Sequence, residues 1–537
     1  MNVAELAIRC LENEGVKCVF GIPGEENLDL MNALHDSRMR FIPTRHEGAA
    51  AFMADFYGRF TGKAGVCLST LGPGATNLVT GIADAYLDRA PLVAITAQES
   101  LSQIHKESHQ FIDTLELFRP ITKWNARLEN PQGTPEIVRK AFKIAQTEKP
   151  GSTHIEVPDD VAELETQGQP LPWVRIRRPS PDRLSLQKAA ELISKADAPM
   201  ILAGNGVIRG GAAEELTKFA EEHCIPVAQT LMGKGSVPWT SPVSLLTMGQ
   251  QTYDYENLGF NTADLVICVG YDFVEYDPKF WNPHGDKKII HIDFTPAEVS
   301  SNYVTEVEIV ADIRESVQLL REACKTSKNM ARVKALRDSA MTRLGSWSRE
   351  YTGLLKPPEI LRELRNAMGE DDILVSDVGA HKVWIGRFFE TYRPKTVFIS
   401  NGLASMGVAL PGGIAIKIAE PNRRVVTLSG DGGFLMSVHE LETAGRENAP
   451  TVNLVFCDGG FGSIRWKQRI KFSRTTGTEF GNPDLLELAR AFRIHGYRAV
   501  SSKDLPSILK EAFELNEPSL IDIPVDYSDN PFLAQKM

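Results

Sequence analysis

The sequence contains few cysteines, and their arrangement excludes most roles for them. There are seven among 537 residues, an odd number, and they are widely spaced without a Cys-x-x-Cys pair. Most fall in apolar runs such as AGVCLST and LVICVGY. We therefore expect reduced cysteines in the core of the protein, and neither a disulfide framework nor a zinc site.

Positive charge is also scarce. Lysine and arginine number 59 against 69 aspartate and glutamate residues, which gives a formal net charge of −10, and the basic residues are dispersed along the chain. A nucleic-acid-binding surface needs a concentrated basic face. We therefore expect no nucleic-acid partner.

Long apolar runs are missing as well. No segment approaches the roughly 18 apolar residues that a membrane-spanning helix needs. The opening MNVAELAIRCLENEG carries acidic residues and lacks the apolar centre of a signal peptide. We expect no membrane partner and a cytoplasmic location.

The patterns that are present predict three domains. A chain of 537 residues exceeds what one hydrophobic core organises, and 42% hydrophobic with 24% charged residues is ordinary for a globular protein. Short apolar runs rich in β-formers alternate with helical patterns over residues 1–165, 183–335 and 355–530. This alternation predicts α/β domains with doubly wound parallel sheets. The proline-rich residues 165–182 predict a linker. The first and third domains have similar size and alternation, which suggests duplication.

Two acidic residues follow neighbouring strands of the third domain. The strand RVVTLSG is followed directly by Asp431, and the strand VNLVFC by Asp458. Because the carboxyl ends of parallel strands share one edge, we expect both carboxylates to reach one cation, and oxygen ligands suit Mg²⁺. The adjoining glycines allow a phosphate to approach the backbone. Taken alone, the Gly-Asp-Gly-Gly motif is equally typical of a tight strand-to-helix turn.

The spacing links this motif to a family. The 25 residues 433–457 separate Gly432 from Asp458, and the stretch resembles the diphosphate-binding domain of thiamine-diphosphate-dependent enzymes. In that family a Gly-Asp-Gly motif is followed, at about this interval, by Asn or Asp. The resemblance implies three metal ligands, namely Asp431, Asp458 and the main-chain carbonyl of Gly460. It also implies contacts to the cofactor from Gly430, Gly432 and Gly433. Asp458 stands where Asn is commoner.

A second segment, RHEGAAAFMADFYGRFTGKAGVCLSTLGPGATN, resembles the pyrimidine-binding domain of the same family. On its own, Glu47 is typical of an acid in the first turn of a helix. The resemblance implies that Glu47 hydrogen-bonds the pyrimidine ring of the cofactor and promotes the tautomer that activates its C2 position. Further cofactor contacts are implied for Gly72, Pro73 and Asn77.

Two more stretches of the third domain resemble the family. In SNGLASMGVALPGGIAIKIAEP, Met406 takes the place of a methionine that wedges under the cofactor and holds its two rings in a V. The small residues there also predict a closely packed helix. In SDVGAHKVW, the backbone of Val378 and Gly379 and the side chain of His381 match a loop that clamps the diphosphate. His381 is equally compatible with a capping or surface role.

Three features resemble the acetolactate synthases, and in particular their catabolic, flavin-free type: Met406 between Ser405 and Gly407, the run ESHQ at residues 107–110 followed by ITKW, and VGYDFVEYDPKFWNP in the central domain. The resemblance implies that the protein decarboxylates pyruvate on thiamine diphosphate and transfers the two-carbon unit to a second 2-oxo acid, giving acetolactate. FAD is not expected. Gln110 is implied in substrate binding, with a loop residue bonded to backbone as the alternative. We assign catalytic roles to Glu47, Gln110 and Met406.

One departure leaves the second substrate open. Glu26 stands where the catabolic type carries a lysine, and an acidic residue would repel a second 2-oxo acid. A lysine from the opening helix or Lys467 is a candidate for the lost positive charge. The alternative function is therefore a thiamine-diphosphate-dependent decarboxylase or carboligase of another small 2-oxo acid. A non-catalytic binding protein with this fold is opposed by the intact Glu47, Asp431 and Asp458.

The resemblance also implies an oligomer. In the family, the activating glutamate and the Gly-Asp-Gly motif of one active site come from different subunits. A homodimer is then the minimum active unit, and we expect a homotetramer built from two such dimers.

Overall fold

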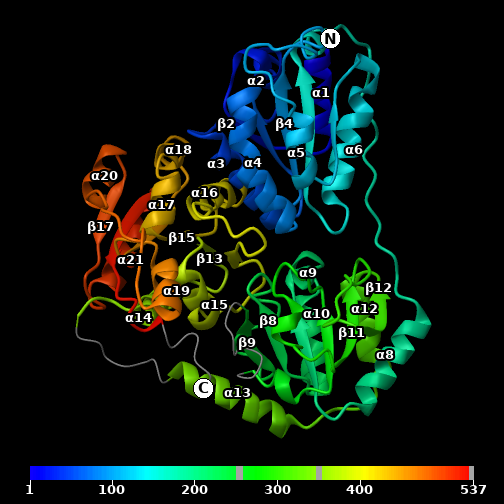
Figure 1. Cartoon of the computed structure of the whole chain (residues 1–537), viewed down its shortest axis with the longest axis vertical. Helices are drawn as coiled ribbons and strands as arrows, with labels where there is room; N and C mark the ends of the chain where they lie inside the picture. Colours follow the sequence, from blue (N-terminus) through cyan, green and yellow to red (C-terminus); the bar gives the residue numbers. More distant parts are fainter. Residues whose placement is uncertain (250–257, 346–352, 531–537) are drawn as a thin grey trace.

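The computed structural model describes residues 1–249, 258–345 and 353–530, and these form three α/β domains (Figure 1). Each domain contains a six-stranded sheet with helices packed around it. Within each sheet, all paired strands run parallel. The predicted fold class is confirmed.

The first domain has the strand order β2-β1-β3-β4-β6-β5. Its central strands are buried along their whole length, because helices cover both faces of the sheet. The strands are β1 (Cys18–Gly21), β2 (Arg40–Pro43), β3 (Gly65–Ser69), β4 (Leu92–Gln98), β5 (Asn125–Arg127) and β6 (Ser152–Pro158). The helices are α1 (Val3–Asn13), α2 (Leu28–His35), α3 (Glu47–Thr61), α4 (Gly72–Leu87), α5 (Thr114–Phe118), α6 (Thr134–Gln146) and α7 (Asp159–Ala162).

Helices α3 and α4 pack closely, and this packing positions the first-domain site residues. Helix α3 begins after His46, whose ring nitrogen accepts the N–H of Gly48, and it ends at Gly62 in the left-handed conformation with φ +74°. A Cβ atom on Gly81 of α4 would lie 2.4 Å from the Cβ of Ala51. Only glycine allows this approach, which brings Glu47 at the start of α3 alongside α4.

The central domain has the order β12-β11-β10-β7-β8-β9, which is the 3-2-1-4-5-6 order of dinucleotide-binding folds. Its strands are β7 (Pro199–Ala203), β8 (Val227–Thr230), β9 (Ser244–Met248), β10 (Leu265–Val269), β11 (Lys288–Asp293) and β12 (Thr305–Val310). Its helices are α8 (Arg183–Lys195), α9 (Asn205–Arg209), α10 (Ala213–His223), α12 (Ile313–Ala323) and α13 (Met330–Gly345).

The third domain repeats the strand order of the first, as β14-β13-β15-β16-β18-β17. This shared order supports the suggested duplication. The strands are β13 (Ile373–Ser376), β14 (Val397–Ile399), β15 (Val425–Gly430), β16 (Thr451–Cys457), β17 (His495–Arg498) and β18 (Ser519–Pro524). The helices are α14 (Pro357–Ala367), α15 (Ala380–Phe388), α16 (Ala409–Ala419), α17 (Asp431–Ser437), α18 (Glu440–Arg446), α19 (Gly462–Phe472), α20 (Leu485–Ala491) and α21 (Leu505–Leu515).

A buried charge cluster joins the first and third domains. The guanidinium of Arg59 forms ion pairs of 2.7, 2.8 and 2.7 Å with Asp55, Asp84 and Asp88, and all three carboxylates are fully buried. The hydroxyl of Ser400 in the third domain donates to Asp84 at 3.0 Å. Burial raises the pKa of Asp84, and the charge of Asp88 raises it further.

Between α7 and α8 the chain forms no named helix or strand and runs along the outside of the molecule from the first domain to the central one (Figure 1). The predicted linker, residues 165–182, lies within this stretch. All seven cysteines are unpaired, as expected. None of the helices in the described ranges combines the length and apolar character that crossing a membrane requires.

Candidate active site

The carboxylate of Asp431 lies against the backbone that follows β16. Its Oδ2 atom accepts the N–H groups of Asp458 at 3.1 Å and Gly459 at 2.8 Å. Asn482, which the sequence did not single out, donates to the same oxygen at 2.8 Å. Strands β15 and β16 are direct neighbours, so the structure brings the two predicted metal ligands to one edge of the sheet.

Asp458 has a cationic partner that the sequence pattern did not indicate. Arg465 of α19 donates to the carboxylate of Asp458 and, at 3.1 Å, to its main-chain oxygen. Burial and, to a smaller extent, the charge of Asp431 raise the pKa of Asp458 to about 6, although Arg465 opposes both effects. Arg465 therefore partly offsets the negative charge that an aspartate brings where asparagine is commoner.

A cavity of about 630 Å³ opens over this edge of the sheet. Its size is typical of a site for a small organic cofactor. All third-domain residues predicted to contact cofactor or metal line it: Val378, Gly379, His381, Met406, Gly430, Asp431, Gly432, Gly433, Asp458 and Gly460. Residues far apart in the sequence thus share one cavity.

His381 lines this cavity and has a ring nitrogen without a hydrogen-bond partner among the described residues. The side chain is 2% exposed, so a surface role is excluded, and its Nε2 atom has no hydrogen-bond partner among the described residues. Burial lowers the pKa of His381 to about 4, which keeps the ring neutral at pH 7. A bound phosphate oxygen would satisfy this nitrogen.

The acidic residues here could supply part of the coordination shell of a metal ion, with other oxygen atoms supplying the rest. Within the described ranges, no group of three or more His, Cys, Asp or Glu side chains is arranged to hold a cation. A metal between Asp431 and Asp458 therefore depends on main-chain and diphosphate oxygens, which suits a hard cation such as Mg²⁺. The donor set fits a metal-bound diphosphate.

Asp377 connects the diphosphate loop to the methionine segment and was missed in the sequence. Its fully buried carboxylate accepts the N–H of Val378 at 2.6 Å and the N–H of Gly407 at 2.9 Å. Burial raises its pKa to about 6. Asp377 thereby fixes the loop at Val378 relative to Met406. An aspartate that follows a strand is also typical of a turn, so the sequence around Asp377 did not indicate this role.

The predicted residues of the first domain also gather in one place. Oε2 of Glu47 accepts a hydrogen bond from Nδ2 of Asn77 at 2.9 Å. Gly72, at φ +48°, lies so close to Gln110 that a Cβ atom would come within 2.6 Å of the Gln110 main-chain oxygen. Pro73 is exposed beside them in the first turn of α4.

Glu26 lies next to this group. Its carboxylate accepts a hydrogen bond from the hydroxyl of Thr70, which lies two residues before the start of α4. Thr70 in turn contacts Gly74, where a Cβ atom would lie 2.9 Å from the threonine methyl and 3.5 Å from Oε1 of Glu47. The negative charge of Glu26 is therefore held at the same edge of the first sheet as Glu47.

The two groups of residues do not meet within the chain. Among the described residues that line the cavity over Asp431, none belongs to the first domain. The structure thus places Glu47, Gly72, Pro73, Asn77 and Gln110 in one group on the first domain, apart from the residues that line the third-domain cavity.

Three family models match the chain in the order of its domains. The N-terminal TPP binding domain of the thiamine pyrophosphate enzymes matches residues 1–117, their central domain residues 186–320, and their C-terminal TPP binding domain residues 377–523. The central match covers all six strands of the central sheet, and the C-terminal match covers the third sheet from β14 onward, apart from the last residue of β18.

Whole proteins are similar over nearly the full chain. The "Acetolactate synthase" of Bacillus subtilis is 35% identical, covering 99% of this chain and 94% of that protein. The "Acetolactate synthase, catabolic" of Raoultella terrigena is 35% identical, covering 99% and 97%. The "Probable acetolactate synthase large subunit" of Methanocaldococcus jannaschii is 38% identical, covering 98% and 92%. The chain belongs to the thiamine pyrophosphate enzymes and, among them, to the acetolactate synthase family.

Proposed function

We propose that this protein is a carboligase that forms acetolactate from pyruvate. In the reaction one pyruvate loses its carboxylate as CO₂, a carbon–carbon bond forms to the carbonyl carbon of the second pyruvate, and one proton is taken up. Thiamine diphosphate, when bound, supplies the electron sink for decarboxylation. The observation that carries the proposal is the single cavity lined by every third-domain residue predicted to contact the cofactor.

The chain's own residues supply binding and proton transfer. We assign Asp431, Asp458 and the main-chain oxygen of Gly460 to Mg²⁺, because their oxygens lie at one strand edge beside the cavity. Glu47 exchanges a proton with the pyrimidine ring, and Asn77 holds its carboxylate in place. We assign the remaining predicted residues to cofactor binding: Gly72, Pro73, Val378, Gly379, His381, Gly430, Gly432 and Gly433.

Met406 and Gln110 complete the assignment. Met406 lines the cavity, and its flexible apolar side chain suits a support for the folded cofactor. Gln110 presents an exposed amide at the edge of the first sheet near Gly72, where it is available to the substrate.

We also infer that the protein does not use FAD. Dinucleotides bind folds of this strand order through backbone N–H groups after the first strand, here β7. In this chain the N–H of Asn205, directly after β7, donates instead to both carboxylate oxygens of Glu275 at 3.1 and 3.0 Å. Because the buried Glu275 carboxylate already accepts this N–H, the N–H is not free for a ligand phosphate, which supports the inference.

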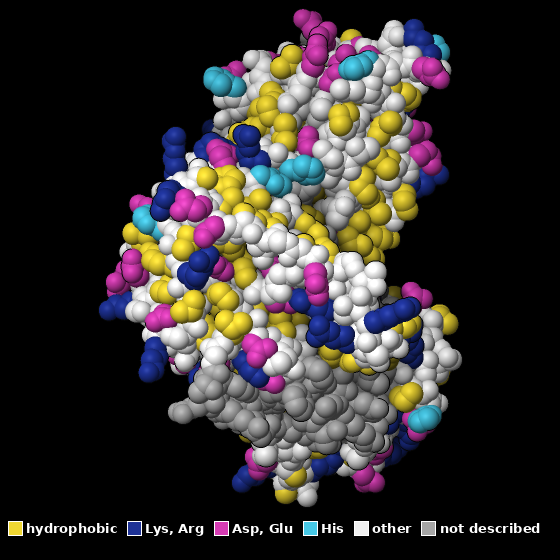
Figure 2. All heavy atoms as spheres, turned by 60° about the vertical axis from the view of Figure 1, so that its left-hand side comes forward, with side chains coloured by type: hydrophobic (Ala, Val, Ile, Leu, Met, Phe, Trp, Pro, Cys, Tyr) yellow, Lys and Arg dark blue, Asp and Glu magenta, His cyan; other side chains and the backbone are white. Residues whose placement is uncertain are grey.

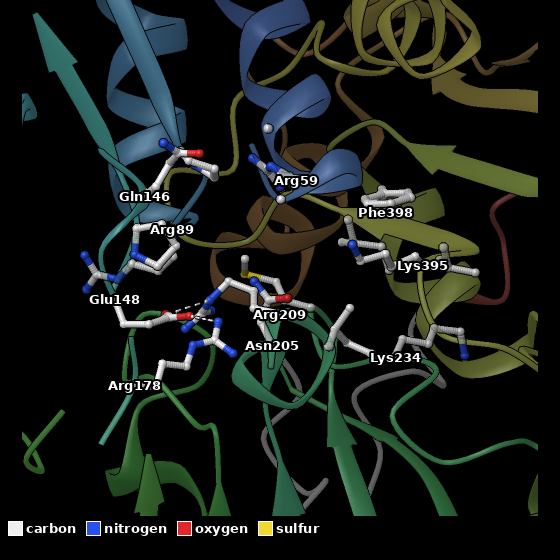
Figure 3. A pocket seen from close by; sticks show the side chains of 18 residues that line it. Arg59, Arg89, Gln146, Glu148, Arg178, Asn205, Arg209, Lys234, Lys395 and Phe398 are labelled. Atoms are coloured by element: carbon white, nitrogen blue, oxygen red, sulfur yellow. Dashed lines mark hydrogen bonds and ion pairs between the residues drawn. The ribbon is translucent and has the colours of Figure 1, made fainter. Parts of the chain in front are cut away.

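The small volume of the cavity beside Asn205 also supports this inference. A cavity of about 100 Å³ lies where the three domains meet, and in it Arg178 and Arg209 turn toward Glu148 (Figure 3). This volume holds a few water molecules and not a dinucleotide. A flavin absorbance band in the purified protein would contradict the inference.

The division of the site supports a homodimer. Each chain carries a Glu47 half-site and an Asp431 half-site on different domains, so a second copy is needed to bring unlike halves together. On the face seen in Figure 2, hydrophobic side chains gather over the first domain, down to where the molecule is hollowed between domains. We propose a dimer as the active unit and a tetramer of two dimers.

Glu26 favours a second candidate, a decarboxylase or carboligase of another small 2-oxo acid, because its charge lies beside Glu47 and repels an anionic acceptor. Product analysis separates the two. Acetolactate from pyruvate supports our proposal, whereas acetaldehyde without acetolactate supports the decarboxylase.

Two broader predictions also stay part of this proposal. We retain 1–165, 183–335 and 355–530 as the domain boundaries. The unpaired cysteines support a reducing, cytoplasmic location.

A further inference from the structure

One face of helix α19 lines the cavity over Asp431. Ser463, Ile464, Lys467 and Ile470 recur at helical spacing, and all four are lining residues. Ile464 and Ile470 are 50% and 63% exposed, so the described residues leave much of this face uncovered. It offers the cavity an apolar surface with one positive charge.

Lys467 is the lysine of the cavity lining for which residues 1–249, 258–345 and 353–530 provide no partner. In the part of the chain that the structure describes, its ammonium forms no hydrogen bond or ion pair. The other lysine of the lining, Lys382, donates to the main-chain oxygen of Ser400 at 3.2 Å and to Asn401 at 3.0 Å. Arg465, on the same helix, is paired with Asp458.

The position of Lys467 separates it from the predicted metal. Helix α19 begins at Gly462, four residues after Asp458, and Lys467 follows five residues later. Five residues correspond to about 7.5 Å along a helix axis. Mg²⁺ and the backbone N–H groups near Asp458 would hold a bound diphosphate at that end of the cavity, which leaves Lys467 available for another anion further along it.

The reaction identifies the anion. The first pyruvate loses its carboxylate as CO₂, whereas the second keeps its carboxylate into the product. A lysine that binds a carboxylate can stabilise the second substrate at every step, because only that substrate keeps its carboxylate. We therefore expect the lysine to bind the second substrate. Ile464 and Ile470 flank Lys467 on the same helix face, and they suit the short alkyl group of a small 2-oxo acid.

We propose that Lys467 binds the carboxylate of the acceptor 2-oxo acid and so favours this anionic acceptor over a neutral aldehyde. The inference rests on the proposed carboligase function. A charge-assisted hydrogen bond provides the attraction. The positive charge of Lys467 would also offset the repulsion that we expect between Glu26 and the acceptor carboxylate. Lys467 belongs to the third-domain half of the site, whereas Glu26 belongs to the first-domain half.

The test compares Lys467→Met with Lys467→Arg and Lys471→Met in the holoenzyme. Lys471 is exposed on the same helix, with its ammonium 5.2 Å from the Phe472 ring centroid, and it does not line the cavity. CO₂, acetolactate and, with added acetaldehyde, acetoin are measured from pyruvate. In Lys467→Met the ratio of acetolactate to CO₂ should fall about tenfold or more while acetoin increases. CO₂ release should stay within about threefold of wild type. Lys467→Arg should retain acetolactate formation, and Lys471→Met should match wild type.

Other outcomes overturn the proposal in distinguishable ways. A wild-type ratio of acetolactate to CO₂ in Lys467→Met excludes the assigned role. Weaker binding of thiamine diphosphate with an unchanged ratio assigns Lys467 to the cofactor. If the wild-type holoenzyme releases no CO₂ from pyruvate, the proposed function fails and this inference fails with it.

Discussion

Nδ2 of Asn77 donates a hydrogen bond to Oε2 of Glu47 at 2.9 Å. The contact joins the second turn of α4 to the first residue of α3, two helices held together by glycine and alanine. It fixes one carboxylate oxygen and leaves the other directed toward Gly74. Asn77 is therefore a positioning residue for the proposed proton exchange at Glu47.

Replacing Glu47 by Gln should slow exchange of the C2 proton of bound thiamine diphosphate by about 100-fold or more, because the proton-exchanging carboxylate is lost. Asn77→Leu should slow it by about tenfold, since the carboxylate is present but less well oriented. Hydrogen–deuterium exchange followed by NMR measures both. Glu129→Gln, an exposed change in the same domain, serves as the control. Wild-type exchange in Glu47→Gln would remove its assigned role.

Asp431→Ala should weaken retention of thiamine diphosphate by at least about tenfold, because a metal ligand and the acceptor for three donors are lost together. Equilibrium dialysis at fixed Mg²⁺ gives the affinity. Asp36→Ala removes an exposed carboxylate that does not line the cavity and should have no effect. Unchanged cofactor affinity in Asp431→Ala would contradict the metal assignment.

Mixing two inactive variants tests whether the active site is shared between subunits. A hybrid of a Glu47→Gln chain and an Asp431→Ala chain contains one site in which both residues are intact. Random reassociation should therefore restore about a quarter of wild-type activity. Each variant carried through the same treatment alone should stay inactive. If the mixture also stays inactive although hybrids are detected by mass spectrometry, each site lies within one chain.

Arg59→Met should destabilise the fold by roughly 3–5 kcal/mol, because three buried carboxylates lose their shared cation. Urea denaturation followed by circular dichroism measures the change. Arg490→Met breaks an exposed pair with Glu487 and should change stability by less than about 0.5 kcal/mol. Equal effects of the two substitutions would show that the buried cluster contributes no more to the free energy of unfolding than an exposed ion pair does.

His154 should make stability fall in acid. Its ring is fully buried against Phe118, 2.8 Å from the Thr96 hydroxyl, and burial lowers its pKa to about 3. Below about pH 6.5 the unfolded chain binds a proton that the folded chain does not, so stability is lost as the pH decreases. The loss between pH 6.5 and 5 should be roughly 2 kcal/mol.

His154→Gln should remove that part of the pH dependence of urea unfolding, while His495→Gln, at an exposed histidine, should keep it. The same slope in wild type and His154→Gln would contradict the account.

The fold was predictable from the sequence where strands are buried. Strands such as β4 and β16 lie inside sheets covered on both faces, so they appear as apolar runs. The edge strands β5, β12 and β17 are short or partly exposed and carry polar residues, and they gave no comparable pattern. The strand orders required the structure, because they depend on long-range pairing.

The site was predictable where residues follow a strand in a motif, as Asp431 and Asp458 do. Residues that reach the site only through tertiary packing were not predictable from the sequence. Asn482 lies 51 residues beyond Asp431, and Asp377 reaches Gly407 across 30 residues. Such contacts have no fixed spacing that a single sequence could show.

The central claim is tested most directly by incubating purified protein with pyruvate and measuring CO₂ and acetolactate, with and without thiamine diphosphate and Mg²⁺. We predict that acetolactate forms with about one CO₂ for each molecule, and only when both cofactors are present. Absence of cofactor-dependent turnover of pyruvate, or CO₂ released with acetaldehyde and no acetolactate, would contradict it.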